Sequence, residues 1–377
     1  MEQRSHKAQI LPRTRRVVVK VGSSTLSSPT GIRRESIATL AQQLAALHAA
    51  GKELVLVTSG AVAAGRSRLG LSGKYKTIPA KQAAAAVGQI ELMALYKEHF
   101  AAYNVNVAQI LLTHDDLGHR KRYLNAKHTM RTLLEAHVLP IVNENDTVAV
   151  EEIQLGDNDN LSAQVAVLIE ADLLVILSDV AGLYSKDPRL HADAALVPLV
   201  EQVDAALLAS GGEAGPLGRG GMASKLEAAR KAAVSGIPTL IVDGRADDAL
   251  TQVFQVDRET GTLFLPVADR LASRKHWIAY TLKPEGTLVV DAGASLAIRE
   301  HGRSLLPPGI REVQGTFDEG ACVMCLDDTG KAFAKGLVNY SADALQQIKG
   351  ARTSHIEQIL GYKVGDEAIH RDDLALL

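Results

Sequence analysis

Val-Val-Val-Lys-Val-Gly-Ser-Ser, residues 17–24, is the stretch that decides the fold. A short run of β-branched residues predicts a strand buried on both faces, and the glycine and serines after it predict a turn. From Arg15 to about Pro266, runs of this kind alternate with long amphipathic stretches rich in Ala and Leu. Such alternation is typical of repeated β-α units, so we predict a three-layer α/β/α domain built on an open, mainly parallel sheet.

The strands and helices of this domain can be placed from the same pattern. Each expected strand is a short aliphatic run, and each expected helix is a longer amphipathic stretch. The expected strands are 17–21, 54–57, 105–112, 138–142, 173–177 and 239–242, and the expected helices are 33–50, 79–101, 120–136, 161–170 and 224–235. Because open α/β sheets bind ligands beyond the carboxyl ends of their strands, we look for the chemistry in the loops at those ends.

The pattern changes beyond about Ala268. Short strands are expected at 288–290, 321–326 and 335–338, among turns rich in Gly, Pro and Asp, and they predict a second, smaller and mostly β domain. We place the boundaries at 1–14 for a polar N-terminal extension, 15–266 for the first domain, 267–284 for a linker, 285–363 for the second domain and 364–377 for a C-terminal tail.

Composition and charge argue against several classes of function. The 377 residues include 41 Lys and Arg against 43 Asp and Glu, a formal net charge of -2 that gives no overall field to attract polyanions or a membrane surface. We find no apolar run long enough for a signal peptide or a membrane span, and we expect a cytoplasmic protein. Cys322 and Cys325 lie in an alternating run without further ligands nearby, so we expect strand positions rather than a metal or redox pair.

Two lysines in distant segments of the chain point to phosphate binding. Lys20 ends the first strand, where a buried ammonium group is costly unless an anion meets it, although a lysine that reaches the surface is the ordinary alternative. The run 218–221, rich in glycine, opens a helix that contains Lys225. Glycine lets the free amides of a helix N-terminus approach an anion, and a flexible surface loop is the alternative there. Together the two segments can hold a triphosphate from both ends, without the spacing of a P-loop.

Two runs rich in Asn and Asp indicate a site for a small polar substrate. Asn-Glu-Asn-Asp at 143–146 follows a strand, and Gly-Asp-Asn-Asp-Asn at 156–160 precedes a helix. Asx turns and a helix N-cap account for some of these side chains, but not for all of them. The amides and a carboxylate suit the α-carboxylate and ammonium groups of an amino acid. We expect Glu144 to be a solvated charge.

Five motifs, in this order, resemble those of the amino-acid kinase family: Val-Lys-Val-Gly-Ser-Ser, Val-Thr-Ser-Gly-Ala-Val-Ala-Ala-Gly, Asn-Glu-Asn-Asp, Gly-Asp-Asn-Asp-Asn-Leu-Ser-Ala and Gly-Gly-Met-Ala-Ser-Lys. The C-terminal part resembles a PUA domain, so the resemblance covers essentially the whole chain after Arg15. It implies transfer of the γ-phosphoryl group of ATP to the side-chain carboxylate of L-glutamate, the first step of proline biosynthesis, with proline as an inhibitor. A kinase of another small carboxylate or of carbamate stays open as the alternative.

The resemblance also implies roles for individual residues. Lys20 and Lys225 match lysines that contact the ATP phosphates and neutralise the moving phosphoryl group, and Asp159 matches the aspartate that orients them. The matched substrate-binding positions are Ser59, Asp146 and Asn158, with Asn143 and Asp157 as neighbours. The matched nucleotide-binding positions are Ser178, Asp179, Arg219, Gly220, Gly221, Met222, Ala223, Ser224 and Lys225, with Arg219 standing where the family often has a small hydroxyl residue.

The family also suggests a homodimer or homotetramer, and Mg²⁺ held mainly by phosphates and water rather than by a protein cage. PUA domains elsewhere bind RNA, which raises a different class of function. Residues 285–377 carry 9 Lys and Arg against 14 Asp and Glu, whereas RNA binding needs a basic footprint. We therefore disfavour nucleic acid as a partner and expect a regulatory or assembly role for this domain.

Overall fold

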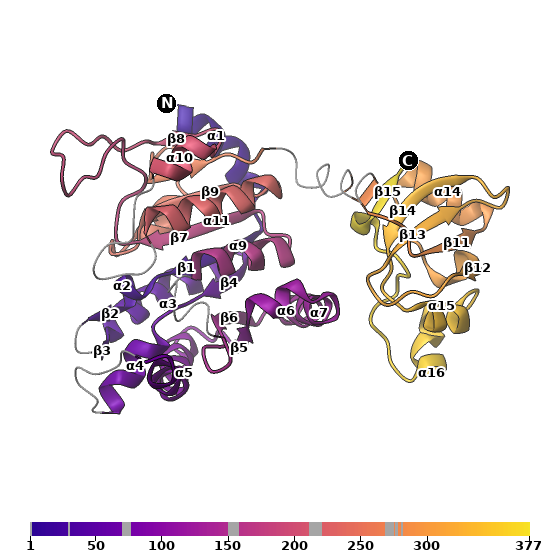
Figure 1. Cartoon of the computed structure of the whole chain (residues 1–377), viewed down its shortest axis with the longest axis horizontal. Helices are drawn as coiled ribbons and strands as arrows, with labels where there is room; N and C mark the ends of the chain where they lie inside the picture. Colours follow the sequence, from indigo (N-terminus) through magenta and orange to yellow (C-terminus); the bar gives the residue numbers. More distant parts are fainter. Residues whose placement is uncertain are drawn as a thin grey trace. The chain divides into compact units, whose positions relative to one another are not determined.

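The computed structural model describes residues 2–28, 31–69, 77–149, 158–210, 221–267, 275, 278–279 and 282–377. The chain forms two compact units, one of residues 1–119 with 129–267 and the other of residues 120–128 with 268–377 (Figure 1).

A mainly parallel sheet forms the middle of the first unit. Its strand order is β5-β6-β4-β1-β7-β9-β10-β8, and the strands are parallel to their neighbours except where β9 meets β10 (Figure 1). The bounds are β1 Arg16–Val21, β4 Glu53–Val57, β5 Val107–Leu112, β6 Leu139–Glu144, β7 Leu173–Ser178, β8 Leu199–Val200, β9 Thr239–Asp243 and β10 Thr262–Phe264. The predicted α/β fold with a mainly parallel sheet is confirmed.

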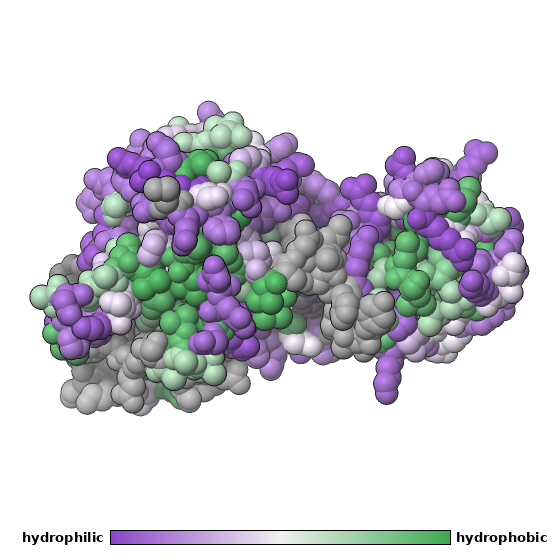
Figure 2. Space-filling model, turned by 90° about the horizontal axis from the view of Figure 1, so that it is seen from above, coloured by the Kyte–Doolittle hydropathy of each residue, from purple (hydrophilic) through white to green (hydrophobic). Residues whose placement is uncertain are grey.

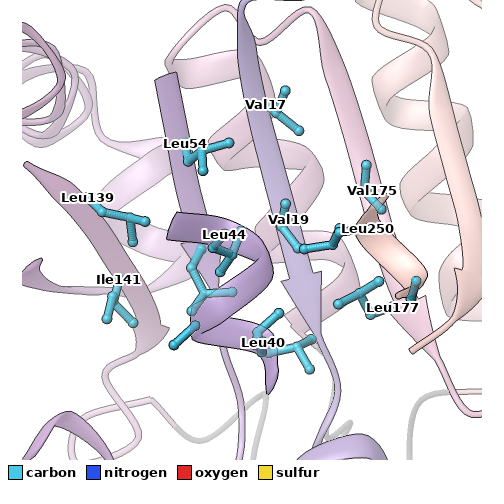
Figure 3. Packing of buried hydrophobic residues seen from close by; sticks show 14 of the residues in the cluster. Val17, Val19, Leu40, Leu44, Leu54, Leu139, Ile141, Val175, Leu177 and Leu250 are labelled. Carbon is cyan, nitrogen blue, oxygen red and sulfur yellow. The ribbon is translucent and has the colours of Figure 1, made fainter. Parts of the chain in front are cut away.

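Three helices cover one face of this sheet: α3 (Arg34–Ala49), α5 (Ile78–Ala101) and α12 (Ala249–Val253). Figure 3 shows Leu40 and Leu44 of α3 lying against side chains of the strands. Val17 and Val19 of β1 belong to the same buried cluster. Since side chains alternate along a strand, Lys20 of β1 points to the opposite face.

The opposite face carries α9 (Asn158–Leu168) and α11 (Met222–Val234), which contact each other. α9 also contacts β1 and β7, and α11 contacts β9. Small side chains let helices approach a sheet closely, and these two helices bury several alanines completely: Ala163, Ala166, Ala228, Ala229 and Ala232. The first turns of both helices therefore lie near the carboxyl end of β1.

Further elements complete the first unit. They are α1 Glu2–Ile10, α2 Ser23–Leu26, β2 Ser27–Ser28, β3 Gly31–Ile32, α4 Ala61–Arg68, α6 His114–Gly118, α7 Arg120–Glu135 and α10 Ala205–Ser210, with a 3-10 turn at Leu11–Arg13. One of them, α7, also contributes its residues 120–128 to the second unit. Polar composition hid α1 in the sequence, because this helix packs through hydrogen bonds rather than an apolar stripe. The Gln3 side chain donates to the carbonyl of Pro198 (2.7 Å), and the Lys7 ammonium donates to the carbonyls of Gln255 (2.7 Å) and Arg258 (2.8 Å).

The second unit contains a sheet of order β12-β11-β13-β14-β15. Its strands are β11 Gly286–Val290, β12 Ile310–Gln314, β13 Cys322–Leu326, β14 Ala332–Leu337 and β15 Leu374–Leu376, with helices α14 Ala292–His301, α15 Ala342–Ile348 and α16 Ile356–Leu360 and 3-10 turns at Pro307–Gly309, Thr353–His355 and Arg371–Asp373. Both cysteines lie buried in β13 as expected, and burial raises the pKa of the Cys325 thiol to about 12.

The segment 364–377, which we expected to be a tail, is part of this second unit. β15 pairs antiparallel with β14, and Ile369 is fully buried in the hydrophobic core. The segment escaped prediction because its strand has only three residues, too few for an alternating pattern to emerge.

Charged and polar side chains cover much of the surface in Figure 2, with hydrophobic residues gathered in patches between them. Among the helices of the described ranges, none is both long and apolar enough to cross a membrane.

Candidate active site

A buried ion triad stands where β1 ends. The Lys20 Nζ lies 2.5 Å from Asp159 Oδ1, and the Lys225 Nζ lies 3.1 Å from Asp159 Oδ2. Asp159 is fully buried, and the two lysines are 4% and 6% exposed. The strand alternation explains the meeting, since it turns Lys20 toward α9, which carries Asp159, and α11, which carries Lys225.

The triad carries a net positive charge at a position that favours binding of an anion. Both oxygens of Asp159 have partners: Oδ1 pairs with Lys20, and Oδ2 pairs with Lys225. The Ser224 hydroxyl also donates to Oδ2 at 2.9 Å. One carboxylate balances only one of the two ammonium groups. Asp159 and Lys225 lie in the first turns of α9 and α11, where free backbone amides and the helix dipole also favour negative charge. A phosphate group of a nucleotide has the charge that this arrangement lacks.

Asn158, one residue before Asp159, organises a second cluster. Its Nδ2 lies within hydrogen-bond distance of three acceptors, the Thr58 carbonyl (2.5 Å), the Ser59 hydroxyl (2.9 Å) and Asn143 Oδ1 (2.9 Å), which share its two hydrogens. Thr58, Asn143 and Asn158 are buried. The cluster therefore joins the end of β4, the end of β6 and the start of α9, and the chain itself connects it directly to the ion triad.

Two carboxylates follow at the end of β6. The strand extends through Glu144, two residues further than the sequence indicated, and this side chain is 8% exposed rather than solvated as we expected. Our expectation for Glu144 was wrong because continued pairing with β5, where Glu144 faces Leu112, holds it inside the fold. Burial and the negative charge of Glu144 raise the pKa of Asp146 to about 6.

The expected nucleotide-binding residues lie at the ends of β7 and at the start of α11. Ser178 is buried at the last position of β7, and the neighbouring Asp179 is exposed. The Ser178 carbonyl accepts from the amide of Gly244, which brings the loop after β9 alongside (2.8 Å). Gly221 is the N-cap of α11, and Met222, Ala223 and Ser224 form its first turn, half-buried.

The structure thus brings together Lys20, Asp159, Lys225 and Ser224 in one group, and Ser59, Asn143 and Asn158 in an adjoining one. Asp157, Arg219 and Gly220 lie outside the described residues. Sequence reasoning missed three residues around the second group: Thr58 and Gln89, which contact it, and Tyr96, which contacts Thr58. Thr58 lies inside a recognised motif, whereas Gln89 and Tyr96 lie within a long helix and carry no local signal.

Two lysines thus meet one aspartate at the carboxyl edge of a mainly parallel sheet, an arrangement suited to binding phosphate groups. The amino acid kinase family model matches residues 15–243, and the PUA domain model matches residues 286–360. The chain belongs to the amino acid kinase family and is an ATP-dependent kinase.

Its curated relatives narrow the class to one enzyme name. The chain is 50% identical over 370 residues to a glutamate 5-kinase of Geobacter sulfurreducens, an alignment that covers 98% of this chain and 99% of the relative. It is 52% identical to a glutamate 5-kinase of Meiothermus ruber (96% of each chain) and 49% identical to one of Chromohalobacter salexigens (100% of each).

Proposed function

We propose that this kinase transfers the γ-phosphoryl group of ATP to the side-chain carboxylate of L-glutamate, giving γ-glutamyl phosphate and ADP, the first step of proline biosynthesis in the cytoplasm. The observation that carries the proposal is the pair of adjoining clusters, one cationic and one rich in amides, joined through consecutive residues Asn158 and Asp159. Full-length similarity to proteins named glutamate 5-kinase supports the same acceptor.

The proposed chemistry needs no general base. A glutamate side chain is already ionised at neutral pH, so the attacking oxygen has no proton to lose. Catalysis is then positioning and charge neutralisation of a loose transition state whose equatorial oxygens carry the charge. Lys20 and Lys225 supply the cations, and Asp159 fixes their positions.

We propose that Mg²⁺ enters with the nucleotide phosphates. In the part of the chain that the structure describes, no group of three or more His, Cys, Asp or Glu could hold a metal ion. The two oxygens of Asp159 are engaged by Lys20, Lys225 and Ser224, which leaves this carboxylate poorly suited to ligating a cation. The ion would supply additional charge neutralisation at the phosphates.

The amide cluster is the proposed acceptor site. Ser59 offers a hydroxyl hydrogen for the α-carboxylate, and Asn158 Oδ1 and the Asp146 carboxylate offer oxygens for the ammonium group. Proline has the same two charged groups on its α-carbon, so we propose that it inhibits by binding at or beside this site. We also propose a homo-oligomer, a dimer or a tetramer, as the family resemblance suggests.

The experiment that tests the function measures ATP consumption with Mg²⁺ and traps acyl phosphate with hydroxylamine. Glutamate, acetylglutamate, aspartate and carbamate are compared, each with and without proline. We expect hydroxamate with glutamate only, and less of it when proline is present. Turnover with another acceptor alone would leave the family assignment standing and overturn glutamate as the substrate.

The raised pKa of Asp146 predicts a pH dependence of acceptor binding. If Asp146 binds the ammonium group as a carboxylate, affinity for glutamate falls as pH drops through about 6, by up to about tenfold per pH unit below it. An ordinary aspartate would keep its affinity down to about pH 4. Glutamate binding is measured by calorimetry in the absence of nucleotide, so that protonation of the nucleotide phosphates does not contribute to the pH profile.

Glu144→Gln is the matched variant for this profile. It removes the neighbouring negative charge that helps to raise the pKa of Asp146, so the midpoint should move to lower pH. A glutamate affinity that is flat between pH 5 and 8 in the unchanged protein would remove Asp146 from the ammonium site.

A further inference from the structure

Three polar residues of α5 line up behind the acceptor site. Gln82, Gln89 and Tyr96 are spaced by seven residues, close to two helical turns, so they share one face of the helix. Each of them meets a residue at or just beyond the end of a strand. The Tyr96 hydroxyl lies 2.8 Å from Thr58 Oγ1, and Gln89 Oε1 accepts from Asn143 Nδ2 at 2.8 Å. The Gln82 amide donates to the carbonyl of Thr147 at 3.4 Å.

Two glycines hold this face against the site. A Cβ atom at Gly88, the residue before Gln89, would lie 1.9 Å from the carbonyl oxygen of Ala61. A Cβ atom at Gly65 would lie 1.8 Å from the carbonyl oxygen of Ala84. α4 and α5 therefore touch backbone to backbone. Because α4 begins directly after Ser59 and Gly60, this close packing fixes how far Gln89 lies from the acceptor cluster.

In the chain of hydrogen bonds from Thr58 through Asn158 and Asn143 to Gln89, the donor and acceptor of each bond are fixed by the one before it. The Thr58 carbonyl can only accept, so it faces the NH₂ group of Asn158 and not its oxygen. The same NH₂ group faces Asn143 Oδ1, which turns the NH₂ group of Asn143 toward Gln89. Gln89 closes the relay by presenting its oxygen. A side chain without an acceptor at this position would remove one of the two hydrogen bonds that hold the amide of Asn143 in this orientation.

The relay leaves donors and acceptors for a ligand. Ser59 Oγ accepts from Asn158, which frees its own hydrogen to donate elsewhere. Two buried atoms of the relay, Asn158 Oδ1 and Gln89 Nε2, have no hydrogen-bond partner among the described residues. An unsatisfied buried polar atom costs about 1–3 kcal/mol, so a fold that keeps two of them in one network has a reason beyond packing.

We propose that Gln89 is a positioning residue for the acceptor. It acts through Asn143 and Asn158, by holding the amide relay in the one direction that presents the Ser59 hydroxyl to the α-carboxylate and Asn158 Oδ1 to the ammonium group of a small amino acid. This role does not involve contact with the nucleotide, which in this proposal binds at the ion triad. The identity of the acceptor as glutamate rests on the proposed function above.

The test compares Gln89→Met with Gln89→Glu in the full-length protein. Methionine keeps the length of the side chain and removes the acceptor, whereas glutamate keeps an oxygen for Asn143 Nδ2. We expect Gln89→Met to raise the KM of the acceptor by about 10- to 100-fold and to leave the KM of ATP within about twofold. Gln89→Glu should restore part of the loss. Gln82→Met, on the same face of α5, is the matched control and should change the acceptor KM by less than about threefold, because its bonds are long.

The outcomes separate a positioning role from a structural one. An unchanged acceptor KM in Gln89→Met would overturn the proposal, and so would an equal rise in the KM values of acceptor and ATP. If Gln89→Met does not fold, Gln89→Glu alone decides. An acceptor KM of Gln89→Glu equal to that of Gln82→Met supports a positioning role for the oxygen at residue 89. A KM that rises as much for ATP as for the acceptor refutes that role. All values are measured with whichever acceptor the unchanged protein uses, so failure of glutamate as substrate does not decide the role of Gln89.

Discussion

The Asp159→Asn variant should lose about 10²- to 10³-fold in kcat, the loss typical of removing one preorganised charge-stabilising group. Asp159 binds Lys20 through one oxygen and Lys225 through the other, and it is fully buried. An amide cannot balance either ammonium group. The two ammonium groups then lose the carboxylate that binds both of them, and they move apart from the positions that meet the transferred phosphoryl group.

The same substitution should also destabilise the fold. Removing one partner of a buried ion network typically costs about 3–5 kcal/mol, because an unbalanced charge stays behind. Added ATP should recover part of this loss, since its phosphates supply the missing negative charge. Thermal unfolding with and without nucleotide, beside single-turnover kinetics, measures both effects.

Ser224→Ala is the control for Asp159→Asn, because it removes only a neutral hydroxyl that donates to the same carboxylate. We expect it to cost less than about tenfold, the effect of one ordinary hydrogen bond. Lys20→Met and Lys225→Met should each lose activity on the scale of Asp159→Asn. If Asp159→Asn kept kcat within tenfold of the unchanged protein, the carboxylate would not be holding the two lysines for catalysis.

The sequence predicted the central strands of the sheet well because they are buried on both faces. A run such as 17–21 is continuously aliphatic, so the expected strand differs from β1 by one residue. The general place of the candidate site was predicted from the fold, since the loops rich in Gly, Asn and Asp follow the carboxyl ends of parallel strands. The identity of the acid that meets the lysines did not follow from the pattern alone. Glu144, Asp146 and Asp159 are chemically alike, and only the strand alternation and the first turn of α9 select one of them.

Other features were hidden because their signals depend on distant partners. Gln89 stands in a helix where a glutamine is ordinarily a surface residue, and its bond to Asn143 joins positions 54 apart in the chain. Lys7 is a buried lysine whose partners are backbone carbonyls, which leave no trace in side-chain composition. In each case the residue type predicts exposure, and a tertiary contact overrides that preference.

The Gly88→Ala variant should lose both stability and acceptor binding. The added methyl group would lie 1.9 Å from the Ala61 carbonyl oxygen, a backbone atom that cannot rotate away, so α4 and α5 must separate by about 1 Å or more. Overpacking of this kind costs about 1–3 kcal/mol. Alanine favours a helix over glycine by about 1 kcal/mol, so the measured loss is a net value.

The displacement should also reach the chemistry, because α4 starts at the residues that follow Ser59 and α5 carries Gln89. A misplacement of about 1 Å can cost about 10²-fold in rate, so we expect kcat/KM for the acceptor to fall on that scale while the KM of ATP changes little. Gly118→Ala is the matched control, because a Cβ there meets no atom within 4 Å. It should leave stability within about 0.5 kcal/mol and activity unchanged. Equal melting temperatures and equal acceptor KM values in the two variants would mean that the helices yield without moving the site, and the acceptor cluster would then owe its geometry to the strand ends alone.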